Sequence, residues 1–138
     1  LPPPGTVGLT LCDIPSNAFF GVTVNMRHAL RSYTDSPVPM SYKVHTAFHE
    51  MLHSFVARYT PSDSTLLAAN ASESVCVRQH LHLLALQKAV LVSLGDLAAL
   101  EQVVANDSRL PSACYRRAWS IVNASPQAYR GFVAELSR

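Results

Sequence analysis

Two histidines enclose a glutamate in the segment His49-Glu50-Met51-Leu52-His53. On an α-helix, positions i and i+4 lie on one face, one turn apart, so His49 and His53 can direct imidazole nitrogens to a single zinc ion. Glu50 lies roughly 100° further round such a helix. From there its carboxylate can accept a proton from a water held by the ion. The pattern therefore indicates a zinc-dependent hydrolase in which His49 and His53 bind metal and Glu50 is catalytic.

The residues around this segment fit the same interpretation. Thr46 stands three places before the first histidine, and the apolar Phe55 stands two places after the second. These flanks resemble the extended HExxH pattern of the zincin metallopeptidases. With this chain's six histidines and four glutamates, the motif is expected by chance in about 0.7% of sequences. The alternative is an amphipathic helix with two histidines that face a core.

Apolar residues recur at spacings of three and four through this part of the chain, which is the pattern of an amphipathic helix. Pro39 and Pro61 bound the pattern, and Ser41 is the expected N-cap. We therefore predict a helix over about residues 42–59. The apolar positions that define it are Val44, Phe48, Met51, Leu52, Phe55, Val56 and Tyr59.

The rest of the chain has strand and turn character first and helical character afterwards. The expected strands are 7–11 and 19–26, and the other expected helices are 74–94, 96–106, 111–123 and one opened by Ser125 and Pro126. Strands followed by helices predict an α+β fold. At 138 residues we expect a single zincin-like domain, 1–138, with short N-terminal strands and a helical bundle that carries the HExxH helix.

Composition excludes several classes of partner. The net charge is only +2 and no basic cluster occurs, so we expect no nucleic-acid partner. No apolar run is long enough for a membrane span. The chain begins at Leu1 and not at methionine, and we expect an N-terminally truncated protein that is secreted or periplasmic after loss of a leading segment.

The three cysteines, Cys12, Cys76 and Cys114, are an odd number and contain no CxxC pair. This spacing indicates neither a disulfide framework nor a second zinc site. Two arrangements are equally compatible with it. The first is one disulfide with one free thiol, and the second is three buried thiols.

A zinc hydrolase site usually has a third protein ligand. The short-spacer pattern HExxHxxGxxH is excluded, because Val56 and Tyr59 occupy its glycine and histidine positions. Glu73 lies 20 positions after His53, a spacing that resembles thermolysin-like enzymes. The alternative for Glu73 is a solvent-facing acid near a helix N-terminus.

His80 and His82 are the competing candidates on a strongly apolar helix. They differ by about 200° around that helix, so they cannot share one metal. His53 lies six residues before the end of the first predicted helix, and His80 lies six residues after the start of the second. If the two helices form an αα-hairpin, these residues are at the same level. We predict His80 as the third ligand. The alternative for His82 is a hydrogen-bonded core histidine.

The segments 77–86 and 115–122 are similar to a group of small bacterial HExxH proteins. The resemblance covers about residues 44–136, and in those proteins a His-Leu-His-Leu helix accompanies the metal helix. It implies a zincin fold and a peptide or protein substrate, and it favours His80 over Glu73. Zincins also use later residues to stabilise the oxyanion, for which Tyr115, His82 and Arg116 are candidates beside the alternative of core packing.

Two further expectations concern the surroundings of the site. The zincin resemblance implies that strand 19–26 pairs with an extended substrate. His28 and His45 are expected at the surface or in loops. His45, four places before His49, shares its helix face and is also a candidate for an outer contact to the ligands.

The sequence thus supports a zinc-dependent metallopeptidase. The main alternative is a non-catalytic zinc-binding or interaction domain with a zincin-like fold. A third interpretation is a metal site of two histidines and one carboxylate that catalyses a reaction on substrates other than peptides. Retention of Glu50 favours the first, because structural zinc needs no general base.

Overall fold

The computed structural model describes residues 6–19 and 21–137. Leu1, on which the expectation about the N-terminus rests, and Phe20, in the predicted second strand, lie outside them. The chain divides into two units, one extending to Phe55 and the other beginning at Val56.

The N-terminal unit contains a two-stranded parallel sheet. Strand β1 (Val7–Thr10) pairs with strand β2 (Val22–Asn25), with Val7 opposite Val22. Val22 and Val24 are buried, as their alternation predicts. A single turn of 3-10 helix, η1 (Arg27–Ala29), follows the second strand.

Asn25 organises the connection between the two strands. Its buried side-chain amide donates to the carbonyl oxygens of Cys12 and Ile14, and its backbone N–H donates to Ser16 Oγ at 3.0 Å. Thr23 exchanges two backbone hydrogen bonds with Asn17, at 2.8 and 3.0 Å. The edge of β2 away from β1 is therefore already bonded to this connection, which does not favour the predicted pairing of the strand with a substrate.

Helix α1 (Met40–Tyr59) carries the HExxH segment as one continuous helix. It begins two residues earlier than predicted, directly after Pro39, whose carbonyl oxygen accepts the backbone N–H of Tyr42 at 3.0 Å. Ser41 lies inside the helix, so its assignment as N-cap was wrong. Proline before a first turn fits helix initiation, because its fixed φ suits that position.

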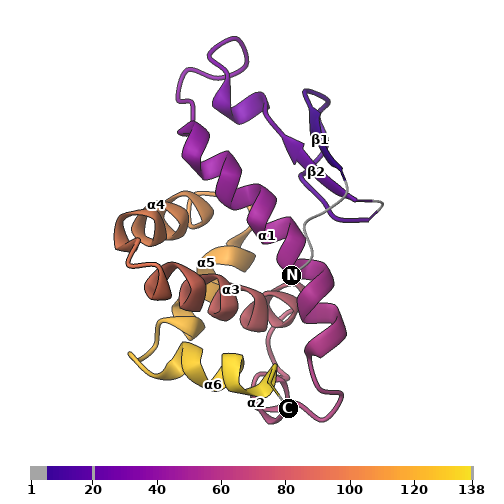
Figure 1. The fold of residues 1–138 in the computed structure, drawn as a ribbon, viewed down its shortest axis with the longest axis vertical. Coiled ribbons are helices and arrows are strands. Elements are labelled where there is room, and N and C mark those ends of the chain that lie inside the picture. The colour runs from indigo at the N-terminus through magenta and orange to yellow at the C-terminus, as the bar shows by residue number, and fades with distance from the viewer. Residues whose placement is uncertain (1–5, 20, 138) are drawn as a thin grey trace. The chain divides into compact units, whose positions relative to one another are not determined.

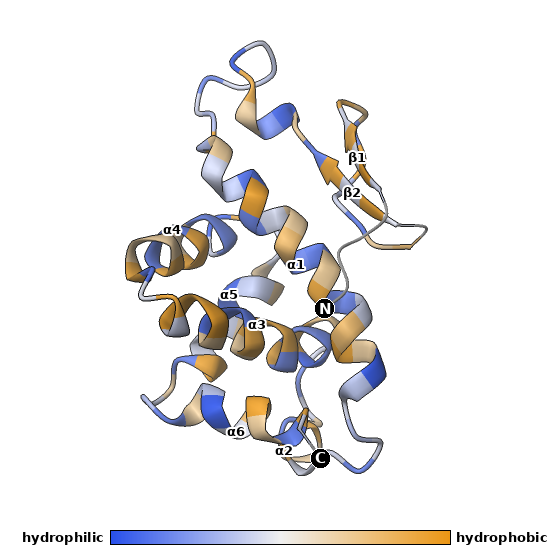
Figure 2. Ribbon diagram, in the orientation of Figure 1, coloured by the Kyte–Doolittle hydropathy of each residue, from blue (hydrophilic) through white to orange (hydrophobic). Residues whose placement is uncertain are grey.

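The second unit is a helical bundle around helix α3 (Figure 1). Helix α3 packs against the three helices that follow it, and a short helix precedes it. The elements are α2 (Thr65–Ala69), α3 (Val75–Ser93), α4 (Leu97–Asp107), α5 (Ala113–Val122) and α6 (Ala128–Glu135). Hydrophobic residues dominate α3, as Figure 2 shows, and its buried side chains extend from Val77 to Leu91.

Local signals explain most of these helix ends. Ser74 and Asp96 cap α3 and α4 by accepting backbone N–H groups of Val77 and Ala99. Gly95 ends α3 with φ +73°, a conformation that glycine adopts without steric cost. Helix α6 starts later than predicted, because Pro126 lies in a turn between Ser125 and Ala128.

The structure confirms an α+β fold with two short parallel strands followed by a helical bundle. The stretch between the predicted helices 42–59 and 74–94, for which no element was predicted, contains helix α2. None of the helices in the described part of the chain combines the length and apolar character that crossing a bilayer requires.

Candidate metal centre

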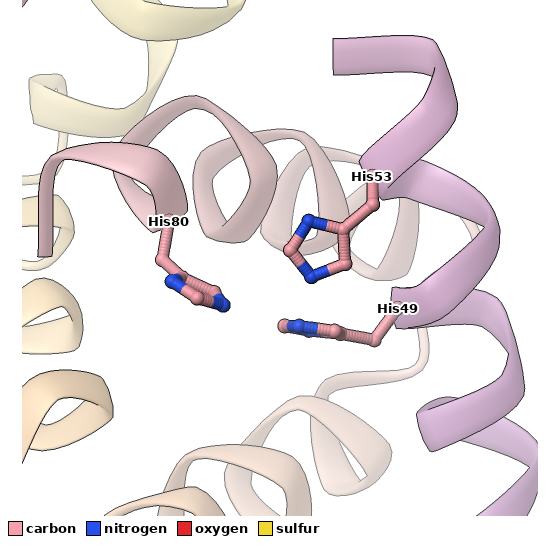
Figure 3. Close-up of side chains that lie close together, drawn as sticks. All are labelled: His49, His53 and His80. Carbon is pink, nitrogen blue, oxygen red and sulfur yellow. The ribbon is translucent and has the colours of Figure 1, made fainter. Parts of the chain in front are cut away.

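His49 and His53 project from successive turns of α1, on the same side of the helix (Figure 3). Their ring centroids are 5.0 Å apart, and the rings meet edge to face at 76°. His49 is buried at 6% exposure and His53 is half-buried. The structure thus confirms that one helical face presents both imidazoles of the motif, as two ligands of one ion require.

Glu50 follows His49 on α1 and is also buried, with 6% of its surface exposed. Burial raises the pKa of the Glu50 carboxyl to about 7, because a charge is poorly solvated in a protein interior. A carboxyl that titrates near neutral pH can both accept and return a proton, which suits a general base.

His80 projects from α3, in the second unit, and is buried at 7% exposure (Figure 3). Its Nδ1 lies 2.8 Å from the carbonyl oxygen of Cys76. A carbonyl can only accept, so Nδ1 carries the proton and Nε2 carries the lone pair. Burial lowers the pKa of His80, and the bond to Cys76 and the charge of Asp107 oppose this only in part. His80 is therefore a neutral imidazole with a defined tautomer.

Glu73, the alternative third ligand, lies just before the N-cap of α3. Arg117 on α5 donates to its Oε1 through Nε at 3.0 Å and through Nη2. The hydrogen bond from Arg117 lowers the pKa of Glu73. Glu73 thus lies near a helix N-terminus, as the alternative interpretation expected, but it is half-buried and paired with Arg117 and does not simply face solvent.

His82 is a core histidine. It is 1% exposed, its Nε2 lies 2.9 Å from Glu135 Oε2, and its ring meets Phe132 edge to face. Burial lowers the pKa of His82, and the Glu135 carboxylate opposes this. The bond to Glu135 occupies one ring nitrogen, and together with the burial of His82 it favours the core interpretation.

Glu135, on α6, was not identified from the sequence as an important residue. Its carboxylate also accepts hydrogen bonds from the hydroxyls of Ser64 and Thr65 and from the backbone N–H of Leu66. Burial raises the pKa of Glu135, but these bonds together with the one from His82 outweigh burial and lower it to about 2. The carboxylate therefore joins the start of α2 to α3 and α6.

The other candidate residues have varied surroundings. Tyr115, half-buried on α5, places its ring 4.7 Å from that of His80, whereas Arg116 beside it is exposed. His28 is exposed in η1, as predicted. His45 is half-buried within helix α1, so the expectation of a surface or loop position was wrong for it. Sequence reasoning did not identify Asp107, which is buried and accepts a hydrogen bond from Trp119 Nε1 at 2.9 Å.

The three cysteines form one disulfide and leave one free thiol. Cys76 on α3 is bonded to Cys114 at the start of α5, and Cys12 is exposed. Both bonded sulfurs lie 3.9 Å from His80 Nδ1. Of the two arrangements compatible with the sequence, the structure therefore has the first.

No protein-family model, no curated protein and no solved structure matches this chain.

Proposed function

We propose that this chain is a zinc-dependent hydrolase, specifically a metallopeptidase that acts on peptides or proteins. His49, His53 and His80 are the proposed metal ligands, and Glu50 is the proposed general base. The observation that carries the proposal is the continuous helix α1, which presents both motif histidines on one face with a buried carboxylate next to the first.

The chemistry of the donor set fits zinc. The three proposed ligands are imidazoles, a ligand type that zinc binds readily. Metal-binding histidines commonly donate their second ring N–H to a backbone carbonyl, which fixes the ring and makes the other nitrogen a better ligand. The bond from His80 Nδ1 to the Cys76 carbonyl is a contact of this kind, and it would leave Nε2 to bind the metal. Three histidines and one open position are typical of catalytic zinc.

Glu50 performs the proton transfers in this proposal. A zinc ion held by three imidazoles supplies a Lewis acid that polarises a carbonyl and acidifies a water. Glu50 accepts the proton of the attacking water and returns it to the departing amine nitrogen. Burial raises the pKa of Glu50 to about 7, and a cation held by the neighbouring histidines would favour the ionised, proton-accepting form of this carboxyl.

The disulfide bears on the compartment. Disulfides persist in oxidising environments and are rare in the cytosol. The Cys76–Cys114 bond therefore supports the proposal that the protein is secreted or periplasmic.

The test measures metal content and hydrolysis together. Protein purified without chelator should contain about one zinc per chain, and His49→Ala and His53→Ala should each abolish binding. Glu50→Gln should retain zinc and lose at least ~100-fold in hydrolysis rate on a mixed peptide library, the low end of a general base's contribution.

Glu101→Gln is the matched control, because Glu101 is exposed on α4, and it should cleave like the wild type. Full zinc retention after loss of either motif histidine would exclude this metal site. Zinc-loaded wild type that cleaves nothing in the library would instead favour the non-catalytic zinc-binding domain.

A further inference from the structure

A second group of potential metal ligands lies within the helical bundle. It consists of Cys76 and His80, one turn apart on α3, and Cys114 at the start of α5. The ligand atoms of the three side chains all lie within 4.8 Å of one another. The proposed function uses only His80 of this group, through its other ring nitrogen.

The distances within this cluster approach those of a zinc site. With Zn–S of about 2.3 Å and Zn–N of about 2.0–2.1 Å, a tetrahedral site has S···N edges of about 3.6 Å and an S···S edge of about 3.8 Å. Both sulfurs lie 3.9 Å from His80 Nδ1, close to the required edge. The Cα atoms of the two cysteines are 6.0 Å apart, so side-chain rotation can separate the sulfurs once they are no longer bonded.

We propose that reduction of the Cys76–Cys114 disulfide creates a zinc site formed by the two thiolates and His80 Nδ1. A dithiol reductant supplies two electrons and two protons, breaks the S–S bond and leaves as its own disulfide. Zinc then displaces the protons of both thiols, and two protons are released to solvent. Two cysteines and one histidine leave a fourth position for water.

His80 must change its tautomer to enter this site. In the oxidised protein Nδ1 donates to the Cys76 carbonyl, and a metal at Nδ1 replaces that hydrogen bond and moves the proton to Nε2. A neutral imidazole cannot then also bind a metal through Nε2. If the proposed function holds, on which this consequence rests, the two sites compete for His80, and disulfide formation assigns it to the hydrolytic site.

Access to the cluster is sufficient for this chemistry. Cys76 is half-buried and offers a reductant a route to the bond, whereas Cys114 is 6% exposed. The ring of Tyr115 covers His80 at 4.7 Å. The site would thus be largely enclosed, which favours retention of a bound ion.

The experiment uses a variant that lacks the two motif histidines and the free thiol, Cys12→Ser/His49→Ala/His53→Ala. Cobalt(II) serves as the probe, because thiolate ligands give it a charge-transfer absorption in the near ultraviolet. The variant is tested as purified and after reduction with dithiothreitol, which is removed under anaerobic conditions. We expect one equivalent of cobalt with thiolate absorption in the reduced form only, displaced by zinc.

Two further variants in the same background assign the ligands. Adding Cys114→Ser should abolish the thiolate-rich spectrum, and adding His80→Ala should weaken cobalt binding while leaving the thiols. Circular dichroism with and without zinc monitors folding of the reduced chain. Absence of cobalt binding after reduction, an unchanged affinity after His80→Ala, or helix loss that zinc does not restore would each overturn the proposal. Because the motif histidines are absent, none of these outcomes depends on the proposed hydrolase.

Discussion

Replacing Glu135 with alanine should lower the free energy of unfolding by about 2–6 kcal/mol. The carboxylate accepts four hydrogen bonds, from Ser64, Thr65, Leu66 and His82, and is itself 3% exposed. Alanine removes all four bonds at once. The loss of stability depends on which of the four donors can form a hydrogen bond to water in place of the carboxylate.

Two of the four donors are buried. His82 is 1% exposed and Ser64 is 7% exposed, so each would be left without an acceptor in the interior. A buried polar group without a partner costs about 1–3 kcal/mol, which gives about 2–6 kcal/mol for the pair. Thr65 is exposed, so water can replace its bond at little cost. The loss is large compared with a typical total stability of about 5–15 kcal/mol.

Urea denaturation followed by circular dichroism measures this difference. Glu101→Ala is the matched control, because Glu101 is exposed on α4, and it should change stability by less than about 0.5 kcal/mol. A Glu135→Ala variant as stable as the Glu101→Ala control would refute the reasoning.

Acidification provides an internal check on the same residue. The hydrogen bonds hold the folded-state pKa of Glu135 at about 2, below the value of 4.5 for a free glutamate. A depressed folded pKa contributes stability that is present above the unfolded pKa and lost as the pH falls through the folded pKa. The wild type should therefore lose this contribution as the pH falls from about 5 to 2. The difference in the free energy of unfolding between the wild type and Glu135→Ala should become smaller over that range.

Two other predictions concern the third ligand and the disulfide. In chelator competition, His80→Ala should lower zinc affinity far more than Glu73→Ala, because Arg117 already binds the Glu73 carboxylate; the reverse order would favour the thermolysin-like spacing. The double variant Cys76→Ala/Cys114→Ala should lower the free energy of unfolding by roughly 4 kcal/mol, from the chain entropy of a loop with a separation of 38 residues. A loss below about 1 kcal/mol in urea denaturation would show that helix packing alone constrains this loop.

Sequence patterns determined the features that depend on residues near one another in the chain. The three- and four-residue spacing of apolar side chains predicted helix α1, and the i, i+4 spacing placed His49 and His53 on one of its faces. The apolar pattern over 74–94 predicted helix α3 to within one residue at each end. These signals act within one or two turns, so they can be read without knowing how helices pack.

Only the tertiary structure decided the partners of the polar residues. His82 meets Glu135 across 53 residues, and Glu73 meets Arg117 across 44. The disulfide that lies against His80 joins two helices whose cysteines show no local motif. Nothing in the spacing of such residues encodes their contact, because it arises when apolar faces pack and bring distant side chains together. The sequence therefore identified a motif that can hold a metal, while packing determined which histidine lies in the core and which adjoins the disulfide.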